Sequence, residues 1–244
     1  MTSTSKTQRF LTKVTNTGAD DATSTSDLLA LSGEFPFVEW GLLQSAKKQG
    51  HARYPSPEWQ ANFSMCDVQK ALHVCGKLAT DLMAGHRGPM STAVALGTAR
   101  VQVNGWKPSP ALDLAAVDYW FHYEFILQAR DLDSFVVATC HAATTRQYSG
   151  KASVLWDPSG GRGIRGAFSL LPGHGLMGAL AAGVSAPVGY AGGIGPDNIN
   201  EVLAQLSDRG PCWIDMESNV RTNDRLDLDK VRAVLEAAAP YVLP

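Results

Sequence analysis

The feature that most constrains the fold is a strand-like segment that recurs eight times along the chain. Each segment is a short run rich in β-branched and aromatic residues, and the eight begin 24 to 35 residues apart. They are Arg9–Thr15, Phe37–Gln44, Ala71–Gly76, Ala99–Gly105, Tyr123–Gln128, Ala152–Asp157, Pro187–Gly193 and Cys212–Glu217. Helix-like stretches fill the intervals, as in Asp227–Ala239, where apolar residues recur with the 3.6-residue period of a helix.

Eight strand–helix units in 244 residues predict an α/β fold of the (β/α)8 TIM-barrel type. A doubly wound sheet is disfavoured, because it needs a glycine-rich turn after its first strand and this chain has only Gly18 there. The glycine-rich turns instead follow the sixth and seventh strands. We therefore expect a single domain, with the barrel over residues 9–244 and a disordered N-terminal tail at residues 1–8.

Composition limits the partners and the compartment. The chain has 21 Lys and Arg against 23 Asp and Glu residues, which gives no general attraction to nucleic acid or an anionic membrane. A charge-free stretch at 166–196 is interrupted by prolines and glycines, so we expect no membrane span. The N-terminus lacks an apolar signal segment and the four cysteines form no Cys-x-x-Cys pair, which favours a cytoplasmic protein with reduced thiols.

Barrels of this type carry their active sites at the C-terminal ends of the strands, and four motifs fall at those ends here. They are VQVNG at Val101–Gly105, WDPSGGRG at Trp156–Gly163, YAGGIGPDN at Tyr190–Asn198 and WIDMES at Trp213–Ser218. The loop after the second strand adds ARYPSP, which contains Arg53. These positions are the first candidates for a functional site.

In this order and on these strands, the motifs resemble those of phosphoribosylanthranilate isomerase, a barrel enzyme of tryptophan biosynthesis. The resemblance extends over nearly the whole chain. It implies an acid–base isomerisation of a phosphorylated sugar or a similar anionic small molecule, with no cofactor. It also implies that Asp157 is the general acid that protonates the furanose ring oxygen.

The glycine-rich turn after the seventh strand favours phosphate binding. Gly192 and Gly193 allow close approach of the backbone, and a helix expected to begin at Pro196 would direct its N-terminal amides toward an anion. The alternative is an ordinary tight turn, and the carboxylates of Asp215 and Glu217 would repel a phosphate unless Arg162 or Arg221 offsets them. The substrate- and phosphate-binding candidates are Arg53, Gly161, Arg162, Gly192, Gly193, Glu217 and Ser218.

The chain departs from the family where that family has its general base. The family's first-strand cysteine aligns with Thr15, whose hydroxyl is too weak an acid to yield a base unassisted, and its strand-four histidine aligns with Asn104. We therefore consider Cys75, Asp20 and Asp21 as the base. Cys75 could instead be a buried filler on the same strand face as His73, and the two aspartates could be loop or helix caps.

Other functions remain open on the sequence alone. A lyase or aldolase could use Asp157, and a barrel without the cysteine base could bind a metabolite or a protein without catalysis. His73, Cys75, Asp157 and Glu217 could be metal ligands, but no ligand spacing supports such a site, so we expect no metal. The expected partner is a small anionic substrate, and the sequence carries no signal for an oligomeric state.

Overall fold

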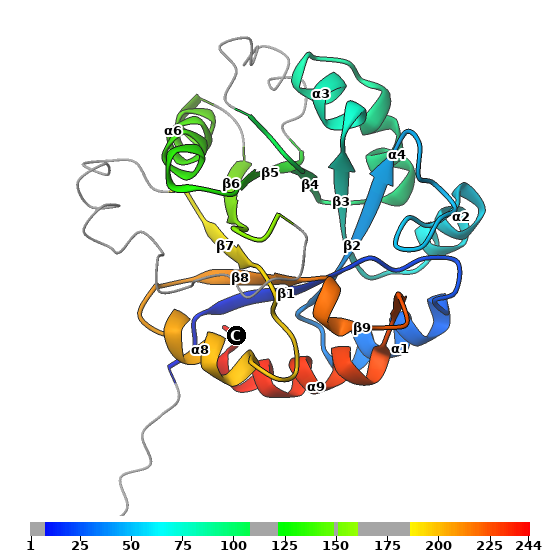
Figure 1. Ribbon diagram of the computed structural model, residues 1–244, viewed down its shortest axis with the longest axis vertical. Helices are drawn as coiled ribbons and strands as arrows, with labels where there is room; N and C mark the ends of the chain where they lie inside the picture. Colours follow the sequence, from blue (N-terminus) through cyan, green and yellow to red (C-terminus); the bar gives the residue numbers. More distant parts are fainter. Residues whose placement is uncertain (1–7, 108–121, 149–150, 161–185) are drawn as a thin grey trace, which may run out of the picture.

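The computed structural model describes residues 8–107, 122–148, 151–160 and 186–244. Within these ranges, eight parallel strands close into a barrel in sequence order, and helices lie outside the ring of strands (Figure 1). The predicted (β/α)8 TIM barrel is confirmed. The strands are β1 (Leu11–Thr17), β2 (Val38–Ser45), β3 (Gln69–Cys75), β4 (Arg100–Val103), β5 (Glu124–Ala129), β6 (Lys151–Trp156), β7 (Val188–Ala191) and β8 (Cys212–Met216).

Each predicted strand coincides with an observed one, and no strand end differs by more than two residues. The largest shift is in β1, which ends at Thr17 and not at Thr15. This shift places Thr17, followed by the turn at Gly18, at the C-terminal end of the barrel. The N-terminal tail predicted at residues 1–8 falls almost entirely outside the described residues.

Capping side chains begin several of the helices. The hydroxyl of Ser24 accepts from the N–H of Asp27 and starts α1, that of Ser56 starts α2, and the carboxylate of Asp227 starts α9. The helices described are α1 (Thr25–Glu34), α2 (Pro57–Ser64), α3 (Lys77–Met83), α4 (Gly88–Leu96), α6 (Leu132–Tyr148), α8 (Ile199–Leu206) and α9 (Leu228–Ala238). None of them is long and apolar enough to cross a membrane.

The segment after β7 corrects one expectation. The helix expected to begin at Pro196 begins at Ile199, with Asn198 at the N-cap position. The side chain of Asn198 does not cap the helix; its Oδ1 accepts from Gly195 N at 2.9 Å and holds residues 195–198 in a turn. The sequence also predicts a helix that begins at Ser109 and Pro110, and this segment lies outside the described residues. After β8, the chain forms the short 3-10 helix η2 (Ser218–Val220), the hairpin of β9 (Arg221–Thr222) and β10 (Arg225–Leu226), and, after α9, η3 (Ala239–Tyr241).

The interior of the barrel is polar at both ends and apolar between them. The apolar part is a cluster of four buried side chains: Ile126, Leu155, Ala191 and Trp213. Gly189 leaves room for the Trp213 ring, since a Cβ at that glycine would lie 2.0 Å from the ring. The guanidinium of Arg100 packs over the same ring, 4.3 Å from its centroid, so the apolar cluster adjoins the charged N-terminal end of the barrel.

Candidate active site

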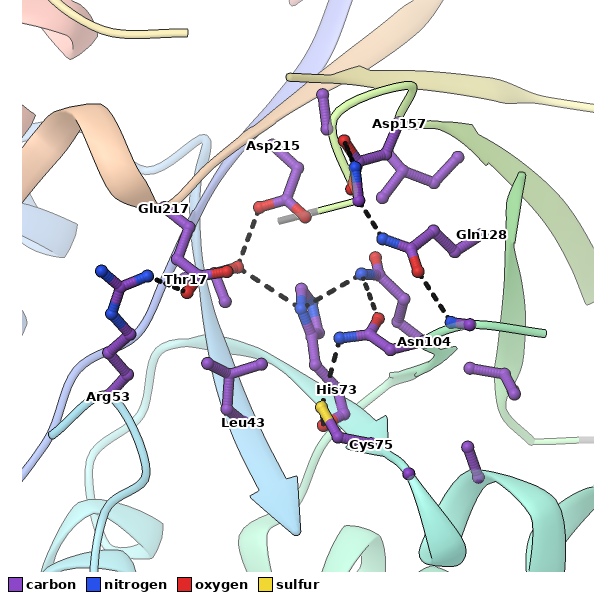
Figure 2. A pocket seen from close by; sticks show the side chains of 18 of the residues that line it. Thr17, Leu43, Arg53, His73, Cys75, Asn104, Gln128, Asp157, Asp215 and Glu217 are labelled. Carbon is purple, nitrogen blue, oxygen red and sulfur yellow. Dashed lines mark hydrogen bonds and ion pairs between the residues drawn. The ribbon is translucent and has the colours of Figure 1, made fainter. Parts of the chain in front are cut away.

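A pocket of about 1370 Å³ opens at the C-terminal ends of the strands. All eight strands, or the residues directly after them, contribute to its lining. This is the end of the barrel at which (β/α)8 enzymes carry their active sites. Figure 2 shows the polar side chains that point into it.

The pocket brings together most of the residues singled out from the sequence. Its lining includes Arg53, Cys75, Asp157, Gly192, Gly193, Glu217 and Ser218. Gly161 and Arg162 lie outside the described residues. Asp20 and Asp21 are not part of the lining.

Asp157 follows β6 and is almost completely buried at the pocket wall. Its Oδ2 accepts from Gln128 Nε2 at 2.6 Å. Its Oδ1 accepts from the N–H and the hydroxyl of Ser159, at 3.2 and 2.7 Å, and from Gly160 N at 3.1 Å. The carboxylate therefore caps its own loop and also faces the pocket. An aspartate at a strand end that is followed by glycines can be a loop cap or a catalytic group, and the two roles are compatible here.

Asp215 lies near the end of β8, and the surroundings of its carboxyl group differ from those of Asp157. Burial, together with the nearby carboxylates of Glu217, Asp157 and Glu39, raises the pKa of Asp215 well above its ordinary value. The hydroxyl of Thr17 donates to Asp215 Oδ1 at 2.8 Å and opposes that rise. Asp215 is thus a buried acid at the pocket that holds its proton to higher pH than an exposed aspartate.

Glu217 shares an ionic cluster with Arg53 at the rim. Burial raises the pKa of Glu217, and the hydrogen bond and charge of Arg53 oppose the rise. Arg53 Nη1 lies 2.9 Å from Glu217 Oε1, and its Nε lies 2.8 Å from Asp224 Oδ1. Arg53 holds a positive φ of 73°, which is uncommon for a non-glycine residue, and its side chain lines the pocket.

The two aspartates of the β1–α1 loop hold neighbouring loops together. Asp20 accepts from the backbone N–H of Arg53 at 2.8 Å and pairs with Arg221 at 3.0 Å. Asp21 accepts from the hydroxyl of Ser56 at 2.6 Å, next to the start of α2. These contacts match the capping alternative, and they keep both carboxylates away from the pocket lining.

The wall formed by β3 and β4 is uncharged. Burial lowers the pKa of His73 to about 3, so the imidazole is neutral, and burial raises the pKa of the Cys75 thiol. Asn104 Nδ2 donates to Cys75 Sγ at 3.3 Å, and Gln102 Nε2 donates to Asn104 Oδ1 at 2.8 Å. Because Cys75 keeps its proton, it is poorly suited to act as a base at neutral pH.

The structure corrects the register that placed Thr15 at the pocket. The Thr15 hydroxyl donates to Glu39 Oε2 at 3.0 Å inside the barrel, and it is Thr17, two residues later on the same strand face, that lines the pocket. The signal available in the sequence is Gly18, since Cys75 and Asn104 also stand just before a glycine at a strand end. Sequence reasoning also missed the amides Gln102 and Gln128, whose residue type signals no particular chemistry.

The turn after β7 is fixed by two asparagines. The carbonyl of Gly193 accepts from Asn198 Nδ2 at 2.8 Å and from Asn219 Nδ2 at 2.7 Å, which ties the turn to η2. Gly192 and Gly193 both have positive φ, 115° and 66°, which explains the glycine pair. Among the described residues, no three His, Cys, Asp or Glu side chains are grouped so that they could hold a metal ion.

Comparison with known proteins supports the fold. No protein-family model matches the sequence, and no curated protein matches it. N-(5'-phosphoribosyl)anthranilate isomerase from Pyrococcus furiosus is similar in structure, with a TM-score of 0.58, 14% identity, and coverage of 95% of this chain and 99% of that one. For 3-hexulose-6-phosphate synthase from Salmonella typhimurium the TM-score is 0.55, the identity 12%, and the coverage 94% and 99%.

A third similar structure is a truncated 3-deoxy-D-arabino-heptulosonate 7-phosphate synthase from Thermotoga maritima. Its TM-score is 0.58 and its identity 10%, with coverage of 96% of this chain and 90% of that one. At such identities the shared property is the (β/α)8 barrel itself.

Proposed function

We propose that this barrel is an acid–base enzyme that isomerises a small phosphorylated sugar or a similar anionic compound, with Asp157 and Asp215 as the proton-transferring pair. The observation that carries the proposal is the contrast between these two carboxyl groups of one pocket. Asp157 accepts from four N–H and O–H groups, whereas burial raises the pKa of Asp215. Two carboxyl groups in unlike environments can divide the acid and the base roles of one reaction.

In the proposed reaction, Asp157, whose carboxylate accepts four hydrogen bonds, removes a proton from the carbon next to a carbonyl or imine carbon. The electron pair of that C–H bond forms a carbon–carbon double bond, and Asp215, the buried acid, gives its proton to the oxygen or nitrogen that takes up the charge. Asp157 then returns its proton to the neighbouring carbon, and Asp215 takes the hydroxyl proton from the first carbon, so that a carbonyl forms there and both carboxyl groups regain their starting states. Asp157 is thus the base, in place of Cys75, Asp20 and Asp21 and of the acid role that the resemblance implies for it, since the thiol is held protonated and the two aspartates form hydrogen bonds outside the pocket.

The walls of the pocket support a hydroxylated, anionic substrate. The amides of Gln102, Asn104 and Gln128 offer donors and acceptors that suit sugar hydroxyl groups. Arg53 and the turn at Gly192 and Gly193 offer the places for an anionic group. The names of the three similar structures each contain a phosphorylated compound, which agrees with this substrate class.

The proposal is tested by following hydrogen exchange from solvent. Ribose 5-phosphate, ribulose 5-phosphate and N-(5'-phosphoribosyl)anthranilate are each incubated with the protein in D₂O, and NMR follows loss of the C–H signal next to the reacting carbon. We expect deuterium to enter at least one of them. Asp215→Asn and Asp157→Asn should each lower the rate by about 10²–10⁴-fold, the usual contribution of a general acid or base.

Asp21→Asn is the matched control, because it removes a carboxylate of the same end of the barrel that lies outside the pocket lining. Its exchange rate should stay close to that of the unchanged protein. Exchange that survives in both Asp157→Asn and Asp215→Asn would overturn the assignment. Release of a shorter aldehyde would assign a lyase reaction to the same pocket.

A further inference from the structure

Asp215 is connected to a buried histidine through one hydroxyl group. Thr17 Oγ1 lies 2.8 Å from Asp215 Oδ1 and 3.4 Å from His73 Nδ1, and Figure 2 shows the threonine between the other two side chains. Thr17 comes from β1 and His73 from β3, so the contact reaches across β2. All three side chains are buried.

Gly41 of β2 makes this contact possible. A Cβ at Gly41 would lie 2.3 Å from Thr17 Oγ1 and within 2.9 Å of two ring atoms of His73. Any side chain there would separate the threonine from the histidine. The arrangement therefore depends on four strands, β1, β2, β3 and β8, each supplying a particular residue.

His73 faces Thr17 with an acceptor. Gln102 Nε2 lies 3.3 Å from His73 Nδ1, and in this orientation of the amide Nδ1 accepts and the ring proton resides on Nε2, which is buried without a hydrogen-bond partner among the described residues. Gln102 is itself oriented by its bond to Asn104 Oδ1 at 2.8 Å. Burial, which lowers the pKa of His73 to about 3, keeps the ring in this neutral form.

We propose that Thr17 and His73 are positioning residues that hold Asp215 in one place in both of its protonation states, so that this single carboxyl group can give a proton to the substrate and take it back. When Asp215 is ionised, the Thr17 hydroxyl donates to it. When Asp215 carries the proton, its O–H donates to Thr17 Oγ1, and the hydrogen of Thr17 turns to His73 Nδ1, which then accepts from both Thr17 and Gln102. Only a hydroxyl hydrogen rotates, and no proton leaves the three residues.

The two distances fit the ionised arrangement, since the threonine is close to Asp215 and farther from His73. The part that Asp215 has in catalysis rests on the proposed function. The exchange of donor and acceptor between Thr17 and Asp215, which we call the two-way hydrogen bond, does not depend on that function, because it is a property of the protein without ligand. It is therefore testable by itself.

The charged and polar groups around Asp215 all affect its pKa. Glu217 on the loop after β8, Asp157 after β6 and Glu39 on β2 surround it with like charge, and His73 on β3 is neutral. Within the part of the chain that the structure describes, no ion pair joins Asp215 to a cation. Thr17 then favours the ionised form as a donor, and His73 favours the protonated form by accepting the hydrogen that Thr17 must turn away.

The test is a pH titration of the Asp215 carboxyl by ¹³C NMR in the ligand-free protein, with Asp215→Asn to assign the signal. Thr17→Val removes the donor to the carboxylate and should raise the midpoint by about 0.5–1 pH unit, as for loss of one hydrogen bond. His73→Leu removes the acceptor for the Thr17 hydrogen and should lower the midpoint by a similar amount. The opposite signs are the signature of the two-way bond.

Two further variants complete the design. Thr17→Ser keeps the hydroxyl and should restore the midpoint. Thr15→Val removes an equally buried hydroxyl from the same face of β1 and should leave it unchanged. If His73→Leu does not fold, His73→Asn, whose side chain is too short to reach Thr17, takes its place with the same expected sign.

A midpoint that rises in the His73 variant, or that shifts equally in Thr15→Val and Thr17→Val, would overturn the inference. Opposite shifts without any hydrogen exchange in the sugar phosphates would leave this inference standing and remove the proposed function. Exchange without opposite shifts would do the reverse.

Discussion

Glu39 and Asp215 are two buried carboxylates at opposite ends of the same barrel interior, and each accepts from a threonine of β1. At the N-terminal end, Glu39 accepts from Thr15 at 3.0 Å, and it also lies 3.1 Å from Lys13 Nζ and 2.7 Å from Arg100 Nη1. Burial alone would raise the pKa of Glu39, but the two cations outweigh it and the pKa is lowered. Asp215 accepts a hydrogen bond from Thr17 but has three carboxylates near it, and its pKa is raised.

The difference shows that burial alone does not give a carboxyl group a function. The N-terminal end compensates its charge within the protein and stabilises the fold. Among the described residues, the C-terminal end leaves Asp215 beside the pocket without an ion pair, which opposes folding but suits proton transfer. Substitutions at the two ends should therefore have unlike effects on stability.

Removing Arg100, one of the two cations that pair with Glu39 at the N-terminal end of the barrel, should have the largest effect on stability. Arg100→Met leaves Glu39 buried with one cation fewer, and loss of one partner from a buried pair costs about 3–5 kcal/mol. Urea unfolding at pH 7 measures the change. The double variant Arg100→Met with Glu39→Gln should recover part of it, and a loss below about 1 kcal/mol in the single variant would place this cluster outside the stabilising core.

At the pocket end, removing a charge should stabilise the fold. Asp215→Asn keeps the shape of the side chain and removes a carboxyl group that resists ionisation, so the free energy of unfolding at pH 7 should rise by about 0.5–2 kcal/mol, the range typical of a single stabilising substitution. Glu39→Gln is the matched change at the other end and should destabilise. Two changes of the same sign would contradict the division.

The same two variants should differ in their dependence on pH. Because the folded pKa of Asp215 lies above its ordinary value of 3.8, the wild type loses stability relative to Asp215→Asn as pH rises from about 4 toward the folded pKa. Because the folded pKa of Glu39 lies below its ordinary value of 4.5, its contribution is present above that pH and is lost as pH falls. Urea unfolding of the wild type and both variants at several pH values from below 3.8 to neutral measures both trends, and parallel dependences on pH would contradict them.

The rim arginine should have the smallest effect on stability. Arg53 is partly exposed and its pairs with Glu217 and Asp224 are accessible to solvent, so Arg53→Ala should change the unfolding free energy by less than about 1 kcal/mol. It should nevertheless raise the pKa of Glu217 further, because Arg53 opposes the effect of burial in the unchanged protein. A ¹³C titration of Glu217 checks the shift, and a fall in its pKa would be inconsistent with this pairing.

The fold could be predicted because its signal is repeated. Eight short apolar runs at similar spacing identify a barrel even where each strand end is uncertain by two residues. The same uncertainty was decisive at β1, where Thr15 and Thr17 share a face and only pairing with neighbouring strands shows which one reaches the pocket. Asp157, Glu217 and Cys75 were found because each stands at a strand end.

Two parts of the site could not be predicted from the chain alone. The aspartates of the β1–α1 loop have the right residue type and the right loop, but contacts to Arg53, Arg221 and Ser56, distant in sequence, decide where they point. The contrast between Glu39 and Asp215 depends on which cations the closed barrel brings beside each one. Charge compensation is a property of the tertiary structure, and a residue's type does not reveal it.

The most direct test of the contrast between the two ends is a pH titration of both carboxyl groups in one sample. The ligand-free protein, labelled with ¹³C at the carboxyl carbons of Asp and Glu, is followed by NMR, with Glu39→Gln and Asp215→Asn to assign the two signals. We expect Asp215 to titrate well above 3.8 and Glu39 below 4.5, so that the two carboxyl groups are shifted in opposite directions. An Asp215 midpoint at or below 3.8 would contradict the central claim.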